Sequence, residues 1–205
     1  MTAQTEVTQL VAPQIEEAGE VLGRAFFDDP ATIYVLPDEA KRADPLTWFM
    51  TGTTRYGHLY GEVNTTAAKV EGAAIWLPPE QWEMTPEGTE QAGLGELESI
   101  VGPDAYERFT NVFGHLGELH ERDVQPRHWY LFFLGVAPPR QGQGVGSALI
   151  QPVLARADSE GLPCYLETFK ARNVPFYQRH GFQVVLEDDV PGGPHFWTMK
   201  REARR

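Results

Sequence analysis

A continuously apolar run that leads into a glycine-rich turn constrains this sequence more than any other feature. The run is Trp129–Val136 (WYLFFLGV), the turn is Gln141–Ser147 (QGQGVGS), and residues with helical spacing extend from Val145 to Ser159. A buried strand that turns through glycines into the start of a helix is suited to hold phosphate, because backbone N–H groups converge there and the helix dipole adds partial positive charge. The segment therefore predicts a phosphate-binding strand, turn and helix.

Hydrophobic spacing along the rest of the chain predicts an α/β fold with one mixed sheet. A helix separates the apolar runs 129–136 and 164–168, which predicts a parallel pair of strands in a βαβ unit. The other strands lack long crossovers and should be antiparallel, and we expect a single domain over residues 1–205. Strands are expected at 7–11, 67–70, 73–77, 129–136, 164–168, 182–186 and 195–199, and helices at about 15–26, 38–60, 145–159 and 173–180, with helices and loops over 80–123.

Prolines and glycines set the expected boundaries of several elements. Asp28-Asp29-Pro30 should end the first helix. Glu71-Gly72 should turn a hairpin between the strands 67–70 and 73–77. Pro152 lies inside an expected helix and should kink it or remove one of its hydrogen bonds.

The charge of the chain is uneven. The net charge is −12, with 22 acidic and 7 basic residues in positions 1–125 but 7 acidic and 10 basic residues from 126 onward. This balance argues against nucleic acid as a partner. It fits a polyanionic cofactor on the basic half and a cationic substrate on the acidic half, although acidic residues on solvated helix faces would give the same counts.

The chain has no apolar stretch near the roughly 20 residues that span a bilayer, so no membrane partner is expected. Its first ten residues lack the basic and apolar regions of a secretory signal. Cys164 is the only cysteine, which excludes an intrachain disulfide, and buried packing is its expected role. A cytoplasmic location is therefore expected.

The glycine-rich turn does not fit the common nucleotide motifs. Gly142-x-Gly144-x-Gly146 differs from the GxGxxG spacing, and the Gly-Lys-Ser/Thr of a Walker A loop is absent. The turn matches [Gln/Arg]-x-x-Gly-x-[Gly/Ala], and a second motif, Asn173…Phe176-Tyr177…Gly181-Phe182, follows it. Together these two motifs resemble the GCN5-related N-acetyltransferases, or GNAT family. The resemblance implies a mostly antiparallel sheet whose one parallel strand pair splays apart, flanking helices, and acetyl-CoA as co-substrate without a metal.

The resemblance also assigns roles to residues. It implies that Tyr177 is the general acid for the departing thiolate, unless it is simply a packed tyrosine. Asn173 should bind the pantetheine arm, cap its own helix, or do both. The residues implied to bind coenzyme A are Leu134, Gly135, Val136, Gln141, Gly142, Gln143, Gly144, Val145, Gly146, Ser147 and Asn173.

Glu167 is the candidate general base. It ends the second strand of the expected parallel pair, beside the implied splay, and burial can raise the pKa of a carboxyl far enough for it to act as a base, here through water. The alternative is a strand-end acid held in a salt bridge.

The site for the acceptor, the amine that receives the acetyl group, is expected at the first helix (15–26), the break after it and the second helix (38–60). Asp28, Asp29, Tyr34 and Trp48, with Phe27 and Tyr56, offer carboxylates and aromatic rings for a cationic amine, although core packing explains the rings equally well. Within the family the chain is similar to the puromycin N-acetyltransferase branch over nearly its whole length. It departs from that branch at Asp29, where the branch has a tyrosine.

The histidines show no metal-binding spacing, and His128 and His195 are alternative proton carriers. The leading interpretation is an N-acetyltransferase for a small primary amine, such as an aminonucleoside or another antibiotic. Acetylation of protein N-termini or lysines, and a coenzyme A sensor without turnover, are the alternatives. A homodimer is common in the family and is expected weakly here.

Overall fold

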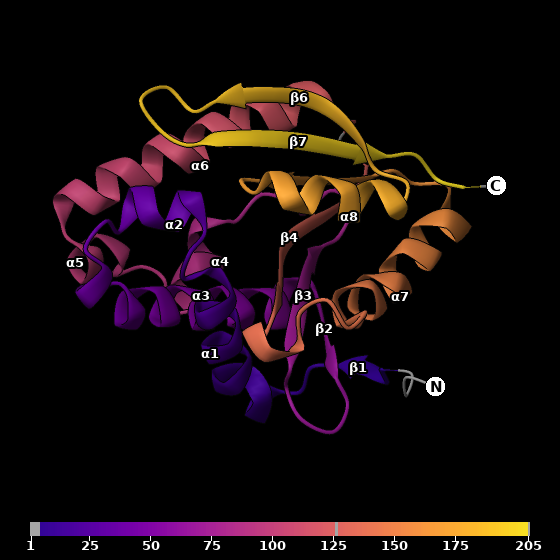
Figure 1. The fold of residues 1–205 in the computed structure, drawn as a ribbon, viewed down its shortest axis with the longest axis horizontal. Coiled ribbons are helices and arrows are strands. Elements are labelled where there is room, and N and C mark those ends of the chain that lie inside the picture. Colours follow the sequence, from indigo (N-terminus) through magenta and orange to yellow (C-terminus); the bar gives the residue numbers. More distant parts are fainter. Residues whose placement is uncertain (1–4, 126, 205) are drawn as a thin grey trace.

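A seven-stranded sheet forms the centre of the computed structural model, which describes residues 5–125 and 127–204 (Figure 1). Residues 1–4, part of the segment inspected for a secretory signal, lie outside these ranges. The strand order is β1-β2-β3-β4-β5-β7-β6. The strands are β1 (Val7–Gln9), β2 (Glu62–Thr66), β3 (Gly72–Leu77), β4 (Trp129–Val136), β5 (Cys164–Thr168), β6 (Gln183–Asp189) and β7 (His195–Arg201).

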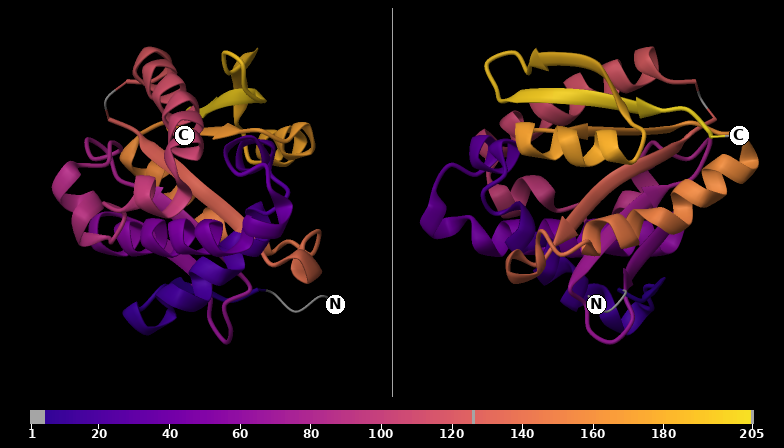
Figure 2. Two further views of the ribbon diagram at one scale, coloured as in Figure 1. Left: turned by 90° about the vertical axis from the view of Figure 1, so that its left-hand side faces the viewer. Right: turned by 45° about the vertical axis from the view of Figure 1, so that its right-hand side comes forward.

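Helices pack against the sheet, and several of them lie beyond it on one side (Figures 1 and 2). α6 runs alongside the β6–β7 hairpin, and buried residues of both elements share one apolar cluster. The helices are α1 (Ile15–Phe26), α2 (Pro30–Val35), α3 (Ala43–Tyr60), α4 (Pro86–Gln91), α5 (Leu97–Val101), α6 (Pro103–Asp123), α7 (Val145–Glu160) and α8 (Val174–Arg179). No helix of the described residues is long and apolar enough to span a membrane.

One strand pair of the sheet is parallel, as predicted. β4 and β5 pair in parallel, and every other neighbouring pair is antiparallel. The parallel pairing covers only Trp129 with Cys164 and Tyr130 with Tyr165, so the two strands part beyond these residues. The fold is therefore the mixed, mostly antiparallel sheet with one splayed pair that the resemblance implied.

The two faces of the sheet carry separate apolar clusters. In β3, Ala73 and Ile75 face the cluster that contains residues of α1 and α3. Ala74 and Trp76 face the opposite cluster, which contains residues of α7. Successive side chains of a strand point to opposite faces, so this fully buried strand is apolar throughout.

The first strand of the expected hairpin is misplaced. The strand lies at Glu62–Thr66 and not at 67–70, and the turn includes 67–70 and does not centre on Glu71-Gly72. The Thr66 hydroxyl donates to the carbonyl of Lys69 and accepts the N–H of Glu71 at 2.9 Å. β2 was missed because it is buried yet polar, and its Glu62 is neutralised by Arg156 of α7.

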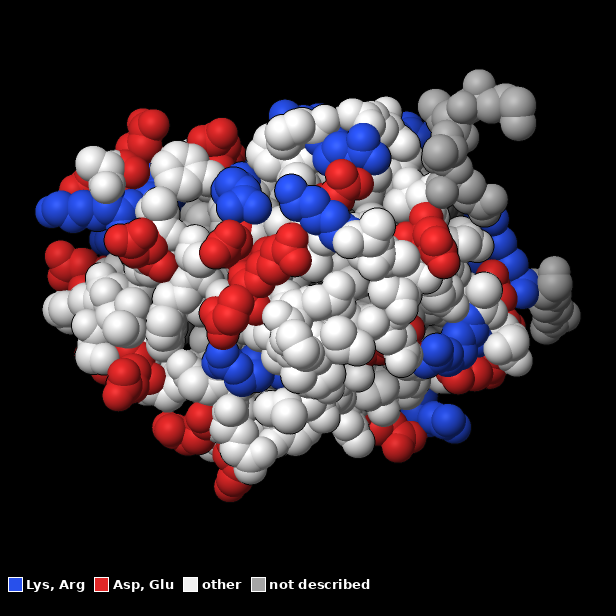
Figure 3. All heavy atoms as spheres, turned by 90° about the horizontal axis from the view of Figure 1, so that it is seen from below, with Lys and Arg blue, Asp and Glu red and all other residues white. Residues whose placement is uncertain are grey.

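Both prolines lie where the sequence predicts them to act. α1 ends just before Asp28-Asp29-Pro30, and Pro30 begins α2, whose first turn is capped by the Asp29 carboxylate accepting the N–H of Ala31 at 3.1 Å. Pro152 lies inside α7 on its exposed side, where it has no N–H to donate, and the helix continues past it. On the face seen from below, acidic and basic side chains lie interspersed (Figure 3).

Two glycines of α1 allow close contact with α3. A Cβ atom added at Gly19 would lie 2.7 Å from the Cα of Thr51, and one added at Gly23 would lie 2.8 Å from the hydroxyl of Thr47. Contacts this short cannot be met without moving one helix. Because α1 also packs on β4 next to Gly135, the two glycines determine how closely α1 and α3 pack together over this face of the sheet.

We expect Gly19→Ala to destabilise the protein by about 1–3 kcal/mol, because the added methyl overpacks the α1–α3 contact. Gly114→Ala is the matched control, since Gly114 is an exposed glycine of α6 with open space around it. That substitution should stabilise by about 0.4–1 kcal/mol, because alanine restricts the unfolded chain. Urea unfolding measures both, and equal effects of the two variants would contradict the packing argument.

Candidate active site

A cleft of about 630 Å³ lies where β4 and β5 part, and it holds ten of the eleven residues predicted to bind coenzyme A. Leu134, Gly135 and Val136 of β4 form one wall. The turn and the start of α7 form another, and Asn173 and Tyr177 border the cleft at α8. Gln143 does not line the cleft and donates instead to the carbonyl of Pro139 at 2.9 Å.

The glycine-rich turn has the backbone conformation that a phosphate site requires. Gly142 and Gly144 adopt φ values of +73° and +84°, which disfavour other residues. Gly144 is the N-cap of α7, so the first N–H groups of a 16-residue helix face the cleft. Gln141 ties the turn to β4 by donating to the carbonyl of Val136 at 3.0 Å.

The cleft is basic. Arg140, Lys170, Arg172 and Arg179 line it, and Asp29 is the one carboxylate among the described lining residues. Arg140 pairs with Glu71 at 3.0 Å, outside the lining. Four cations and a helix N-terminus suit a ligand with several phosphates, such as coenzyme A.

A second cavity, of about 120 Å³, opens beside the cleft and is mainly apolar. Phenylalanines from α1, α3, α6, β4 and the end of β5 surround it. Its ionisable lining groups among the described residues are two carboxyls and two phenols, with no lysine, arginine or histidine. The aromatic and ionisable lining residues are Phe26, Phe49, Phe109, Phe113, Phe132, Phe133, Phe169, Asp29, Glu167, Tyr130 and Tyr177.

Tyr177 stands at the junction of the two cavities and lines both, as do Asp29 and Asn173. Burial, with a smaller contribution from the nearby Asp29 carboxylate, raises the pKa of the Tyr177 phenol. The group is therefore protonated at neutral pH and able to donate. Asn173 donates to the Thr168 hydroxyl at 3.1 Å, and its side chain makes no cap for α8.

Glu167 reaches the second cavity from β5. Its Oε2 accepts the Tyr130 hydroxyl at 2.8 Å, and its Oε1 lies 3.6 Å from Nδ1 of His120. Burial raises the pKa of Glu167 to about 8, while the Tyr130 hydrogen bond acts to lower it. Among the described residues no lysine or arginine forms an ion pair with Glu167, so the salt-bridge alternative is not observed in the described chain.

The four residues predicted for the acceptor side do not lie together. Asp29 is buried at the junction, 3.7 Å from Nζ of Lys170, and burial raises its pKa although Lys170 opposes this shift. Asp28 is exposed beside Phe27 in a separate surface hollow. The Tyr34 hydroxyl accepts from Asn111 at 3.2 Å, whereas Trp48 and Tyr56 lie outside both cavities.

Sequence reasoning missed most of the second cavity's lining. Phe109 and Phe113 are four residues apart on α6, and this spacing places both on one helix face. Tyr130 and Phe132 are two residues apart on β4, and both line the cavity. The spacings were visible in the sequence, but nothing there shows that α6 lies against β4.

No group of three or more potential metal ligands gathers within the part of the chain that the structure describes. His195 is exposed on β7 and contacts Asp189 and Glu187, outside the lining of either cavity. Cys164 is buried in the core, and burial raises the pKa of its thiol to about 12.

Comparisons with known proteins agree with this geometry. The sequence profile described as "Acetyltransferase (GNAT) family" matches residues 69–182, more than half of the chain. An uncharacterized N-acetyltransferase of Schizosaccharomyces pombe is 29% identical over 182 residues, covering 83% of this chain and 71% of that protein. A mycothiol acetyltransferase of Propionibacterium freudenreichii is 33% identical over 131 residues, covering 58% of this chain but only 39% of that protein.

Among solved structures, one described as histone acetyltransferase HPA2 and related acetyltransferase from Corynebacterium glutamicum has a TM-score of 0.67. It is 21% identical, and the match covers 98% of this chain and 97% of that one. The fold and the site thus define an acyltransferase that uses acetyl-CoA. The chain belongs to the GNAT acetyltransferase family.

We expect Gly144→Ala to weaken acetyl-CoA binding about tenfold, or roughly 1.4 kcal/mol. Alanine is strained at a φ of +84°, so the turn can no longer hold its N–H groups together. Gly192→Ala is the matched control, because Gly192 has a φ of +67°, equally open surroundings and no place in the cleft. Calorimetric titration measures the Kd, and equal affinities for both variants would contradict the phosphate role of the turn.

Proposed function

We propose that the protein transfers the acetyl group of acetyl-CoA to the primary amine of a small molecule with an apolar, ring-sized body. The observation that carries this proposal is the aromatic cavity beside the basic cleft. Its apolar walls suit such a body. Its two carboxyls, Asp29 and Glu167, suit an amine that arrives as an ammonium ion.

The reaction requires a proton to leave the ammonium before nitrogen attacks the thioester carbonyl. In our proposal Glu167 takes this proton, directly or through water, since it is the cavity carboxyl with the pKa near 8. The C–N bond forms as the C–S bond breaks, and Tyr177 donates its phenolic proton to the departing thiolate. A backbone N–H near Val136 polarises the carbonyl oxygen.

The cavity also supports a choice between the alternative acceptors. A protein N-terminus or lysine needs an open groove along which a peptide can lie, whereas this cavity is small and is lined by residues of α1, α2, α3, α5, α6, α8, β4 and β5. A likeness to the puromycin N-acetyltransferase branch supports an aminonucleoside as one member of the proposed class. Asp29, in place of that branch's tyrosine, favours a different acceptor from puromycin itself.

Thioester consumption with a panel of amines tests the proposal. We expect phenylalkyl and indolylalkyl primary amines to give a kcat/KM at least tenfold above that of lysine-containing peptides, polyamines or puromycin. The former join an apolar ring to a primary amine in a body small enough for the cavity, whereas the others are either too polar or too large. Tyr177→Phe should lower kcat at least tenfold with every acceptor and leave the Kd for acetyl-CoA unchanged. Peptides as the best acceptors would contradict the small-molecule assignment.

The pH dependence tests Glu167 as the base. Since its pKa is about 8, the carboxylate is present above that pH and lost below it, so kcat/KM should rise with pH through about 8. Tyr130→Phe removes a hydrogen bond to the carboxylate and should move the rise to higher pH. Glu167→Gln should lower kcat by about 10²-fold and abolish the rise. A rise that persists in Glu167→Gln would exclude this residue.

A further inference from the structure

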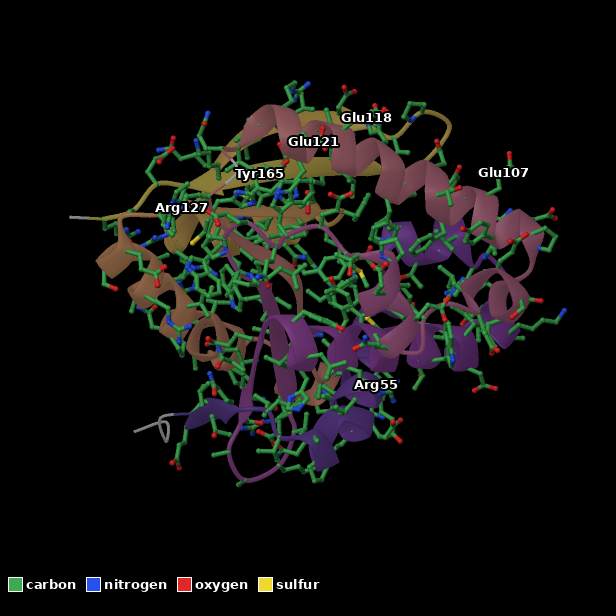
Figure 4. The ribbon with its side chains drawn as sticks, turned by 180° about the vertical axis from the view of Figure 1, so that it is seen from behind. Arg55, Glu107, Glu118, Glu121, Arg127 and Tyr165 are labelled. Carbon is green, nitrogen blue, oxygen red and sulfur yellow. The ribbon has the colours of Figure 1, made fainter. Side chains whose placement is uncertain are left out.

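We propose that His120 and His128 form a relay that carries the acceptor's proton from Glu167 to the loop preceding β4. The inference rests on the proposed function, because it concerns the proton that Glu167 removes. Three consecutive atom pairs carry it, and they connect β5, the end of α6 and the residues before β4. Figure 4 shows this region from behind: Glu118 and Glu121 lie on α6, Tyr165 lies beneath the same end of the helix, and Arg127 marks the loop.

The three pairs run inward from the loop. Nδ1 of His128 lies 2.6 Å from the carbonyl oxygen of Gln125. Nε2 of His128 lies 2.7 Å from Nε2 of His120. Nδ1 of His120 then faces Oε1 of Glu167 at 3.6 Å, and that oxygen is buried without a hydrogen bond. A closure of roughly 0.5 Å would bring this last pair into hydrogen-bond range.

The Gln125 carbonyl determines where the protons lie. A carbonyl can only accept, so Nδ1 of His128 carries a hydrogen. When His128 is neutral, its Nε2 is therefore an acceptor, and Nε2 of His120 must be the donor. A neutral His120 then presents an unprotonated Nδ1 to Glu167. This nitrogen can accept a proton from the carboxyl group but cannot donate to a carboxylate.

Three arrangements of the same three protons satisfy these contacts, and one of them, with His120 as an imidazolium beside the Glu167 carboxylate, is disfavoured by the burial of His120. The other two keep His120 neutral. In the first, Glu167 is protonated, His120 carries its proton on Nε2, and His128 carries its proton on Nδ1. In the second, Glu167 has passed its proton to Nδ1 of His120, and the Nε2 proton of His120 has moved to Nε2 of His128. His128 is then an imidazolium that donates to the Gln125 carbonyl, while Glu167 is again a carboxylate. No proton is created or lost.

The surroundings favour passage through His120 over storage there. His120 is 2% exposed, stacks on Trp82 with ring centroids 4.2 Å apart, and contacts the rings of Tyr130 and Tyr165. Burial and the proximity of His128 lower the pKa of His120 to about 3. A charged His120 is therefore disfavoured. His128 is equally buried, at 1% exposed, but as an imidazolium it keeps the Gln125 carbonyl as an acceptor for Nδ1, and in our proposal it takes the proton from His120.

Three further ionisable groups, Tyr130, Tyr165 and Asp123, lie close to the relay in the described chain. Tyr130 donates to the second oxygen of Glu167, and burial raises the pKa of its phenol. The Tyr165 hydroxyl donates to Asp123 at 3.4 Å, and its pKa is likewise raised by burial. Asp123 is paired with Arg122 at 2.7 Å. Both phenols stay neutral and take no part in the proposed exchange of protons.

His120 and His128 act through Glu167 and are therefore positioning residues. Loss of activity alone would not distinguish this role from a structural one, so the test also measures the KM and the restoration of activity by added imidazole. We expect His128→Gly to lower kcat at least tenfold and to leave the KM for acetyl-CoA unchanged. Added imidazole should restore kcat, whereas pyrazole, a ring of similar shape but far weaker basicity, should not. His115→Gly is the matched control, because His115 lies on the same helix as His120 and lines neither cavity. Its kcat should stay within about twofold of the parent enzyme.

The outcomes separate this inference from the proposed function. Restoration by imidazole alone supports the relay. An unchanged kcat in His128→Gly, or a loss that imidazole and pyrazole restore equally or not at all, overturns it. Glu167→Gln in the same assay tests the base: if it is inactive while His128→Gly is fully active, the relay fails and the base stands. An active Glu167→Gln refutes the base itself.

Nitrogen NMR of the acceptor-free protein gives a readout that needs no turnover. The relay requires a proton on Nδ1 of neutral His128 and on Nε2 of His120. Carbon NMR should also show that the Glu167 carboxyl titrates at a different pH in His120→Phe. A neutral His128 protonated on Nε2, or an unchanged Glu167 titration in His120→Phe, overturns the proposal even if the His128 variant does not fold.

Discussion

The parting of β4 from β5 is the constraint on which the rest of the site depends. The two parallel strands pair only at Trp129 with Cys164 and at Tyr130 with Tyr165. Past this point the facing edges of β4 and β5 no longer pair. A basic cleft and an aromatic cavity can therefore open at the same place. Had the parallel ladder continued, the backbone of Leu134–Val136 would be occupied by β5 and closed to a thioester.

The sequence predicted the residues that gather in the basic cleft far better than those that line the aromatic cavity. The turn Gln141–Ser147 is local: glycine at positive φ, a helix N-terminus and a strand end are all readable from adjacent residues. The cavity depends on α6, which precedes β4 in the chain by only a short loop, and the sequence shows no sign of where this helix packs. Trp48 was an aromatic residue at a plausible spacing, yet its helix turns it away from the cavity.

Two further failures of sequence reasoning have the same physical origin. β2 is a buried strand with polar residues, and its Glu62 is tolerated only because Arg156 of α7 reaches it across the sheet. His120 and His128 are eight residues apart with a helix end between them, so no regular spacing relates them. In both cases the partner that makes a buried polar group stable comes from another element, and a single sequence does not record that pairing.

Burial shifts the pKa of the proposed acid, Tyr177, and of the proposed base, Glu167, in the same direction, and both proposed roles gain from the shift. Removing water raises the pKa of both Tyr177 and Glu167, because both become charged when they lose a proton. For the phenol, which has to donate, the shift secures the protonated form, and the Asp29 carboxylate at the junction adds to it. For the carboxyl, which has to accept a proton in the proposed reaction, the shift brings the pKa close to neutral pH, where a base is most effective. One apolar chamber can therefore serve two opposite proton transfers, provided that Tyr130 keeps the carboxyl from being shifted too far.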